Sequence, residues 1–495
     1  MANIPVPSIA TVTAESDDTV LGSKDGAVRR FPLSSMPVGF TQSGSGAVAR
    51  TVQDKVGEVV SVKDFGAVGD GVTDDTVAFQ NAAAAAKCVY VPSGTYQLSG
   101  TIVVSVDGAH WFGDGISASI LRATTNSLPI FTINGGLNGV TIEEMQLTRT
   151  PTAITGGDGI RCSTVSIGQA TLRRLLVQNQ NNGLSLGPTD WSEVDKVIVQ
   201  KCQNIGFFVT NTASDGACQW SFDTCLSQMN VAQGYLVQTQ AGPAQMTVGT
   251  FKNCATFANS AVGMGFLGSA GVPLQGVRIT GGFIGEDGSH EIYMDTFGGQ
   301  HFIDSVFLEL SGRRTTGPTL TTAASNTGCG IAVTSNNDGI QITGCHSNGN
   351  SQDGYFLSGG SHYLSGCRAT NNGLALGSGR RNGVYSTAGR VVIVGGAFGN
   401  TGAGTSQQYG AFVNDGNNLS VGFADLNGNA TAAWGATSSA TYITSVGNLP
   451  NTLNVGLSPA GSVLIGGGST GGFTAAGTIN VSGGLLKNNT AYTNP

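Results

Sequence analysis

The chain has 495 residues, of which 40% are hydrophobic and only 11% are charged, and its net charge is −7. A chain this apolar and this weakly charged is not disordered, and no segment approaches the ~20 apolar residues that insert into a membrane. The acidic balance without basic runs argues against nucleic acid as a partner.

The N-terminal residues and the cysteines indicate where the protein is made. The stretch MANIPVPSIATVTAESDD (1–18) lacks the basic start and apolar run of a signal peptide. Nine cysteines in a chain of this length do not make a disulfide framework. We therefore expect synthesis in a reducing cytoplasm, wherever the protein finally works.

The first part of the chain predicts a small module followed by a helical cap. DDTVLGSKDGAVRRFPLSSM (17–36) has short strand-like runs, and we interpret residues 1–56 as a separate module with its linker. Residues 61–98 predict a strand, a glycine turn, a helix and a strand, with Thr73 or Asp74 as the helix cap and Asp74 and Asp75 complementing its dipole. Such a helix would seal the open first coil of a solenoid.

A repeat of 22 to 29 residues follows. Cysteines recur at this spacing, and four of them, Cys225, Cys254, Cys345 and Cys367, have Asn five residues later. A Gly and a short apolar strand follow the Asn. This pattern predicts a solenoid with an interior cysteine column and a hydrogen-bonded asparagine ladder. The cluster of Cys345, His346, His362 and Cys367 is therefore interpreted as core cysteines with outer-face or loop histidines, and no metal site is predicted.

The repeat strands also carry an unusual outward row. The residue between the two inward side chains of a strand is apolar at Phe208, Leu236, Phe356, Tyr385 and Phe412. Such a row would exceed the apolar patches of most monomers, and a second copy of the chain is the simplest cover. The coils are expected to run to about residue 440, and residues 441–495 are assigned to a β-rich C-terminal region that docks on partner chains.

Two stretches carry a resemblance to a known family. DFGAVGDGVTDDTVAFQNA followed by VYVPSGTY resembles the first segment of the pectate-lyase-like proteins found in phage tailspikes, and DTVLGSKDGAVRRFPLSSM is similar to their virion-attachment modules. The resemblance implies an all-β, right-handed parallel β-helix over residues 57–440 and a homotrimer completed by 441–495. It also implies an N-terminus bound to the phage tail or baseplate, and binding or cleavage of a bacterial capsule or O-antigen outside the host cell.

Candidate chemistry lies between residues 281 and 314. Glycoside hydrolysis needs two carboxylates, and FIGE and VFLE place Glu286 and Glu309 23 residues apart, which predicts stacking on neighbouring coils. The closeness of the two carboxylates should raise one pKa and supply the acid. Asp295 and Asp304 are the alternative catalytic carboxylates.

Further residues are expected to bind the substrate. Arg313 and Arg314 begin an insertion (311–327) that interrupts the repeat, and such interruptions are often functional. A Trp can stack on a sugar ring, although a half-buried position at the edge of a coil is the commoner role of a Trp in such a repeat. The expected substrate-binding residues are Asp287, His290, His301, Arg313, Arg314 and Trp191. A weaker candidate places Asp215 and Asp223 on either side of Trp220, which is itself interpreted as buried.

Three functions stay open at this point. The first is a tailspike depolymerase that hydrolyses a surface polysaccharide and needs no cofactor. The second is a polysaccharide lyase, in which Arg313 or Arg314 and a Ca²⁺ ion would assist β-elimination across a uronic acid. The third is a tail fibre or adhesin that binds the polysaccharide without cleaving it.

Overall fold

The computed structural model describes residues 19–24, 27–32, 39–150, 154–162, 165–211, 217–240, 246–312, 328–334, 336–374, 380–387, 389–400, 406–414, 418–426, 428–436, 442–446, 464–466, 486–487 and 490–491. The chain forms two compact units, Met1–Val60 and Ser61–Pro495. No helix in the described ranges is both long and apolar enough to cross a membrane.

The described residues of the N-terminal unit form two short antiparallel pairs and one helix. Strands β1 (Thr19–Lys24) and β2 (Ala27–Pro32) form a hairpin, and β3 (Gly39–Phe40) pairs with β4 (Arg50–Thr51). Helix α1 (Val52–Val56) follows directly, with the Thr51 side chain accepting a hydrogen bond from the backbone N of Asp54.

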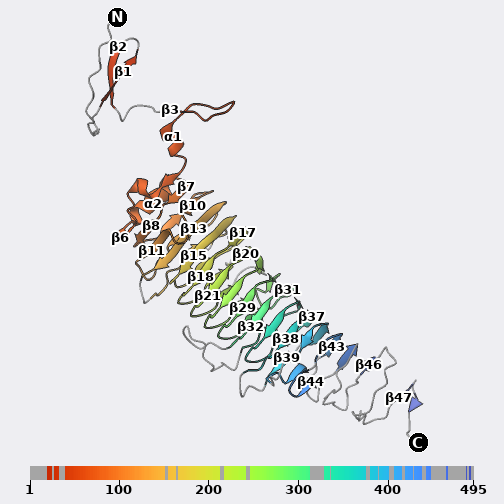
Figure 1. The fold of residues 1–495 in the computed structure, drawn as a ribbon. Coiled ribbons are helices and arrows are strands. Elements are labelled where there is room, and N and C mark those ends of the chain that lie inside the picture. Colours follow the sequence, from red (N-terminus) through yellow and green to blue (C-terminus); the bar gives the residue numbers. More distant parts are fainter. Residues whose placement is uncertain are drawn as a thin grey trace. The chain divides into compact units, whose positions relative to one another are not determined.

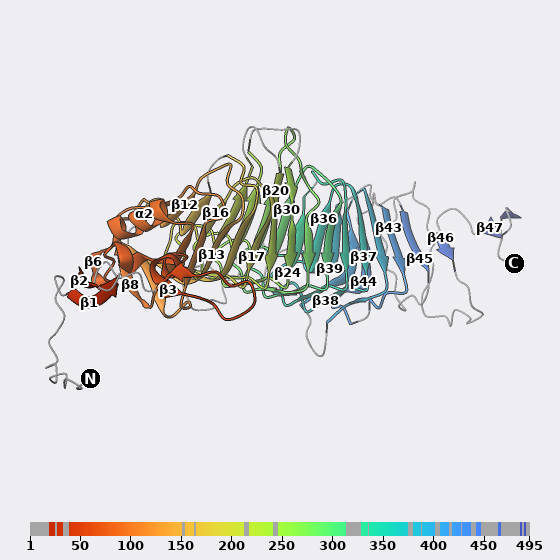
Figure 2. The same cartoon turned by 90° about the horizontal axis from the view of Figure 1, so that it is seen from above.

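The second unit begins with the predicted cap. Strand β5 (Val60–Ser61) contains the last residue of the first unit and the first residue of the second. The cap continues with η2 (Val62–Phe65), β6 (Asp70–Asp74) and α2 (Thr76–Ala85). Helix α2 starts later than expected, with Asp75 at the N-cap position, while the Asp74 carboxylate accepts from the backbone N of Thr76. The buried Phe79 ring contacts the rings of Tyr96 and Trp111, so the helix covers the end of the interior (Figure 2).

Among the described residues, most coils of the β-helix contain three strands, which stack in parallel with the strands of the next coil (Figure 1). The first strands are β7 (Cys88–Val91), β10 (His110–Gly113), β13 (Val140–Arg149), β15 (Ala170–Gln178), β17 (Thr189–Asp195), β20 (Ala217–Asp223), β24 (Thr250–Lys252), β28 (Arg278–Thr280), β31 (His301–Asp304), β34 (Ile340–Thr343), β37 (Ser361–Ser365), β40 (Arg390–Val394), β43 (Asn418–Gly422), β45 (Tyr442–Val446) and β46 (Leu464–Gly466).

The second strands belong to the same sheet, and β13 and β15 are long enough to supply both positions. The others are β8 (Gly94–Leu98), β11 (Ser119–Ala123), β18 (Ile198–Gln200), β21 (Leu226–Gln228), β25 (Ala255–Phe257), β29 (Phe283–Gly285), β32 (Phe307–Glu309), β35 (His346–Asn348), β38 (Arg368–Thr370) and β41 (Ala397–Phe398). Strands β23 (Met246–Val248) and β27 (Leu274–Gln275) extend this sheet beside the first strands.

The third strands form a separate sheet. They are β9 (Ile102–Val104), β12 (Phe131–Ile133), β14 (Ile160–Cys162), β16 (Leu184–Leu186), β19 (Phe207–Thr210), β22 (Tyr235–Gln238), β26 (Met264–Leu267), β30 (Ile292–Asp295), β33 (Ile331–Val333), β36 (Tyr355–Ser358), β39 (Asn382–Thr387), β42 (Tyr409–Val413) and β44 (Ala432–Ala436). A last hairpin joins β47 (Leu486–Lys487) to β48 (Thr490–Ala491). The solenoid predicted from the repeat, and the all-β, right-handed parallel β-helix that the family resemblance implied, are confirmed.

Left-handed residues turn the chain at two corners of the coil. The corner after the first strand uses Glu144, Arg174, Lys196, Thr224, Asn253, Ser305 and Phe423, and the corner after the second uses Asn179, Lys201, Met229, Ala258, Glu286, Leu310 and Asn371, all with φ between 47° and 64°. Glycine adopts this conformation at lower cost. The stacked coils on either side hold these residues in it.

The interior confirms the cysteine and asparagine columns. Cys202, Cys225, Cys254, Cys345 and Cys367 are buried free thiols. The Asn230 side chain donates to Asn259 Oδ1 at 2.8 Å, and the Asn350 side chain donates to Asn372 Oδ1 at the same distance. Because neighbouring coils place these amides in register, each one satisfies the next inside the core.

Two histidine expectations have different outcomes. His346 lies half-buried on the outer side of β35, as expected. His362 is buried, which corrects its interpretation as a solvated residue. Its Nε2 lies 3.1 Å from the backbone O of Gly359, so the ring has a polar partner in its buried position.

Candidate functional site

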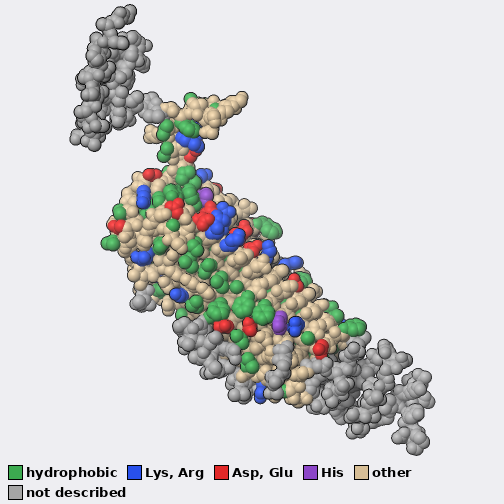
Figure 3. Space-filling view, in the orientation of Figure 1, with side chains coloured by type: hydrophobic (Ala, Val, Ile, Leu, Met, Phe, Trp, Pro, Cys, Tyr) green, Lys and Arg blue, Asp and Glu red, His purple; other side chains and the backbone are tan. Residues whose placement is uncertain are grey.

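The outward side chains of the first strands form one surface, which we call the first-strand face. On it Glu143 pairs with Arg173, Arg173 with Asp195, Asp195 with Asp223, and Asp223 with Lys252. Paired residues of neighbouring strands lie about 4.8 Å apart, so these five residues make a continuous charged row. Figure 3 shows charged side chains of both signs gathered over β13, β15, β17 and β20.

Glu143 anchors one end of the charged row. Its carboxylate is almost fully buried and lies 2.7 Å from His110 Nε2, while it accepts hydrogen bonds from Arg173 Nε at 2.5 Å and Arg174 Nη2 at 2.8 Å. The hydrogen bond from Arg173 lowers the pKa of Glu143 despite burial. The carboxylate is therefore ionised near neutral pH and holds both arginines at the surface.

Asp195 and Asp223 are two carboxylates stacked in register on the same row. Lys196 Nζ lies 3.3 Å from Asp195 Oδ2, and Lys252 Nζ lies 3.0 Å from Asp223 Oδ2. Hydrogen bonds from Thr224 and Lys252 lower the pKa of Asp223. This pair has the backbone spacing that the sequence analysis assigned to Glu286 and Glu309.

Trp191 projects from the first-strand face beside this pair. The register of β17 against β20 shifts between Thr189 and Ser192, so the strand bulges and turns both Asp190 and Trp191 outward. Trp191 has a φ of 63° and is 75% exposed. A bulky side chain in this conformation is strained, and such strain concentrates at functional positions. The structure thus presents Trp191 as a free aromatic surface.

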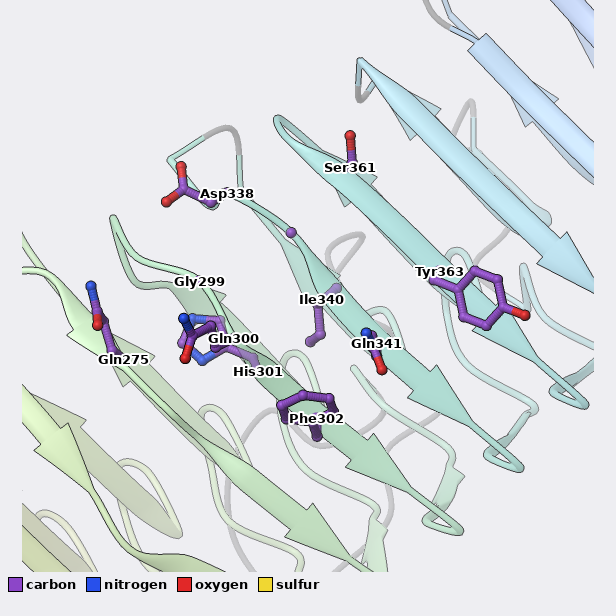
Figure 4. A pocket seen from close by; sticks show the side chains of 11 residues that line it. Gln275, Gly299, Gln300, His301, Phe302, Asp338, Ile340, Gln341, Ser361 and Tyr363 are labelled. Carbon is purple, nitrogen blue, oxygen red and sulfur yellow. The ribbon is translucent and has the colours of Figure 1, made fainter.

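A pocket of about 410 Å³ lies farther along the first-strand face. Phe302, Gln341 and Tyr363 occupy paired positions on β31, β34 and β37, and Figure 4 shows them on one side of the sheet. Tyr363 is 40% exposed and Asp338 is exposed at the rim. The remaining polar lining comes from Gln275, Gln300 and Ser361. Amides, a hydroxyl and aromatic rings are the groups that recognise sugars by hydrogen bonds and stacking.

His301 lies beneath this pocket. It is buried, its Nδ1 accepts from the backbone N of Val277 at 3.3 Å, and its Nε2 lies 2.9 Å from Thr296 Oγ1. Burial lowers the pKa of His301 to about 4. With both ring nitrogens engaged, His301 lines the floor of the pocket, and its role as a substrate-binding residue stays a prediction.

The predicted stacking of Glu286 and Glu309 is wrong by one residue. Glu309 pairs with Gly285 on one side and with Asn348 on the other. Glu286 lies at the left-handed corner that follows Gly285, and its backbone N donates to the backbone O of Glu309. Both carboxylates lie beside the second strands, off the first-strand face.

The two alternative carboxylates lie on different sheets. Asp304 ends β31 and holds an outward position next to Thr280 and Thr343 on the first-strand face. Asp295 ends β30 on the third-strand sheet, where it accepts from Thr334 Oγ1 and Asn336 Nδ2. Asp295 therefore does not stand opposite either glutamate, contrary to expectation.

Asp287 and His290 belong to the interior corner before β30. Asp287 is 0% exposed and takes the ladder position of an asparagine, accepting from Asn259 Nδ2 at 2.9 Å, so it cannot contact a polymer. His290 Nδ1 accepts from the backbone N of Cys329, and burial lowers the pKa of His290 to about 4. The expected substrate-binding role of Asp287 is therefore corrected. That of His290, whose side chain is partly exposed, stays a prediction, and Arg313 and Arg314 lie outside the described residues.

The charged row was missed by the sequence analysis, although a signal existed. WSEVD and WSFD share their last residue, and Val194 and Phe222 before it are a matched inward pair. In the weaker candidate, Asp215 lies outside the described residues, and Trp220 is buried as expected. Among the described residues, no group of three or more His, Cys, Asp or Glu side chains is placed to hold a metal ion.

Comparisons with known protein sequences match parts of this chain. Residues 59–152 match the family described as Rhamnogalacturonase A/epimerase, pectate lyase-like. A tail spike protein of an Escherichia phage is 45% identical over 67 residues, which are 14% of this chain and 8% of that protein. Mannuronan C5-epimerase AlgE1 of Azotobacter vinelandii is 38% identical over 80 residues, which are 14% of this chain and 6% of the epimerase. The matched segments thus span less than a tenth of these relatives.

Solved structures share the β-helix over most of the chain. Tailspike protein 3 of bacteriophage CBA120 has a TM-score of 0.58 and 16% identity, covering 86% of this chain and 71% of that one. The A-module of mannuronan C-5 epimerase AlgE4 of Azotobacter vinelandii has a TM-score of 0.53 and 17% identity, covering 78% of this chain and all of the module. The expected resemblance to pectate-lyase-like β-helix proteins and phage tailspikes is confirmed.

Proposed function

We propose that this protein is a virion-borne phage tailspike that binds and depolymerises a bacterial surface polysaccharide outside the host cell. The observation that carries the proposal is the first-strand face, where an exposed strained Trp191, a charged row and an aromatic, amide-lined pocket follow one another along a single ladder of strands. Extended polymers bind along such faces of solenoids. The likeness to a phage tail spike protein over 67 residues supports the virion setting.

Hydrolysis by two carboxylates is the proposed reaction. Asp195 and Asp223 are paired residues of neighbouring strands, whose backbones lie about 4.8 Å apart. Retaining enzymes hold their two carboxyl groups ~5–5.5 Å apart, a separation that two such stacked side chains can adopt. The lowered pKa of Asp223 suits the nucleophile or base, and Asp195 would then act as the acid. Glu286 and Glu309 stay as a competing pair, since their diagonal offset would suit the wider spacing of inverting enzymes. No cofactor is part of this proposal.

The test is digestion of a panel of purified bacterial capsules and O-antigens. Wild type would be compared with Asp195→Asn, Asp223→Asn, Glu286→Gln and Glu309→Gln by polymer size, reducing ends and near-ultraviolet absorbance. We expect the two aspartate variants to lose reducing-end release by at least ~10²-fold while the glutamate variants keep it. The opposite result would move the chemistry to the glutamates, and full activity in all four would refute both pairs.

The same assay separates the two other functions. Unsaturated products that absorb in the near ultraviolet would identify a lyase, and a Ca²⁺ requirement would then be tested with a chelator. Retention of a polysaccharide without any change in its length would identify a binding tail fibre.

Self-association is also proposed, as a homotrimer through the outward row of the third-strand sheet. Phe356, Tyr385 and Phe412 are paired in register, half-buried and stacked with ring centroids 5.9 and 5.5 Å apart. Phe208 is likewise half-buried, whereas Leu236 is buried because it lies over Gly265. The residual apolar face would be covered by partner chains. Light scattering that gives a stable monomer would refute the trimer.

A further inference from the structure

A second surface lies on the outward side of the second strands and uses none of the residues of the first-strand face. Phe257, Phe283 and Phe307 hold outward, half-buried positions on β25, β29 and β32. The rings of Phe283 and Phe307 are stacked, with centroids 5.8 Å apart and planes 19° apart. His346 on the next strand meets Phe307 edge-on at 5.0 Å. We call these four side chains the aromatic platform.

Glycine makes the platform flat. Gly285 lies between Phe257 and Glu309 on one ladder of paired residues. A Cβ at Gly285 would lie 2.7 Å from the Phe283 ring. The ring therefore occupies the space that a side chain at position 285 would need, and lies across the sheet surface. The result is a shallow aromatic surface rather than a cavity.

Polar groups border the platform on two sides. Glu309 Oε1 accepts a hydrogen bond from Asn348 Nδ2 at 3.0 Å, which leaves Glu309 Oε2 for another donor. Arg368 is exposed next to His346 on the same ladder, and Glu286 lies half-buried at the corner beyond Gly285. Figure 3 shows hydrophobic side chains gathered here with His, Arg and acidic side chains around them.

We propose that the aromatic platform is a second polysaccharide-binding site, separate from the first-strand face. A pyranose ring has a flat C–H face, which stacks on aromatic rings. The hydroxyl groups of the sugar lie at the edge of the ring. The carboxylates and amide at the border accept those hydroxyl hydrogens, and the guanidinium donates to hydroxyl oxygens. Glu286 and Glu309 oppose anionic ligands such as nucleic acid or acidic lipid. The ligand class is therefore a neutral or amino-sugar polymer.

The inference takes its ligand class from the proposed function but assigns different residues to it. In this site Glu309 orients a sugar hydroxyl, so the platform stands together with the Asp195 and Asp223 pair as the catalytic carboxylates and not with the competing glutamate pair. A polymer held on two faces gains affinity through the higher effective concentration at the second site. Binding to long chains should then depend on the platform, whereas the first-strand face keeps its own contacts to short ones.

The test is affinity electrophoresis in gels that contain the purified surface polysaccharides of a bacterial panel. The full-length double variant Phe283→Ala/Phe307→Ala removes the platform. Leu226→Ala, an outward half-buried position on β21 of the same sheet, is the matched control, and Phe307→Tyr keeps the ring. Thermal unfolding of each variant confirms that the fold is retained.

We expect the double variant to bind long polymer roughly tenfold more weakly, the loss typical of removing aromatic contacts from a binding surface. Leu226→Ala and Phe307→Tyr should bind as wild type does. Retention of the double variant equal to that of wild type would overturn the platform and leave the proposed function standing. Retention of wild type on none of the polysaccharides would overturn both.

Discussion

Replacing Asp287 by Asn should remove a loss of folding stability that occurs in the core as pH rises. Asp287 is fully buried beside Glu291, and it occupies the ladder position that Asn230 and Asn259 hold in the preceding coils. Burial raises the pKa of Asp287 from 3.8 to about 6, and burial beside Asp287 also raises the pKa of Glu291 well above its usual range. The two carboxyl groups thus resist ionising together.

The sign of the effect follows from proton linkage. Because the folded pKa of Asp287 is the higher one, the folded protein binds more protons than the unfolded chain between pH 3.8 and about 6. The free energy of unfolding therefore falls as pH rises through this window and levels off above it. A shift of about two pKa units corresponds to a loss of about 3 kcal/mol at pH 7. Asn cannot ionise, so Asp287→Asn avoids this loss and keeps the hydrogen bond from Asn259.

The measurement is the unfolding midpoint of wild type and Asp287→Asn between pH 4 and pH 8, at one scan rate. The two proteins should match most closely at pH 4, and the variant should gain stability steadily up to about pH 6. Asp304→Asn, which removes one outward negative charge, controls for the change in net charge. Parallel pH curves for wild type and Asp287→Asn would refute the reasoning.

Three other changes test the coil. Met229→Gly should raise the free energy of unfolding by about 1 kcal/mol because the left-handed corner favours glycine. Gly349→Ala at the equivalent corner should lower the free energy of unfolding by at least as much. If denaturant unfolding gave changes of the same sign for both variants, this account would be contradicted. Asn259→Ala should cost about 1–3 kcal/mol, because Asp287 and the amide of Asn230 each lose a buried partner; a neutral effect on the unfolding midpoint would remove the ladder from the stability argument. Burial raises the pKa of the Cys202 thiol to about 12, so a thiol reagent at pH 8 should label it only after unfolding, and rapid labelling of the folded protein would show that the coil opens there.

The fold could be predicted from the sequence because the same pattern of buried residues recurs in each repeat. Cysteine at one corner and Asn at the next fix the period, and both columns lie where the spacing placed them. The capping helix followed from a local pattern in the same way, and only its first residue differed.

The site could not be predicted as well, because function depends on register to the single residue. Matching Glu286 to Glu309 gave a step of 23, whereas the structure pairs Phe283 with Phe307 and Ile284 with Leu308, a step of 24. The inward hydrophobic residues fix the register, since they alone are tied to the core. Charged residues on the outer surface are not tied to the core, so a match between them in the sequence does not determine the register.

A bulge defeats sequence matching in a second way. The shared letters WS suggest that Trp191 and Trp220 are equivalent, yet the structure pairs Trp220 with Ser192. The extra residue in β17 sends Trp191 outward, while Trp220 is buried and donates from its indole N to the backbone O of Gly187. Neither composition nor period reveals an inserted residue of this kind.

The stacked core explains how this chain can hold a strained residue for function. Every coil is fixed by its inward side chains and by hydrogen bonds to both neighbouring coils, so one left-handed Trp191 does not unfold the strand that carries it. Replacing Trp191 by Gly relieves the strain and removes the exposed ring together. It should therefore raise stability and lower affinity for the polysaccharide, whereas Met229→Gly raises stability alone. A gain in stability with a loss of affinity at Trp191 would identify a residue kept for binding. A gain in stability alone at Met229 would identify a residue that only turns the chain.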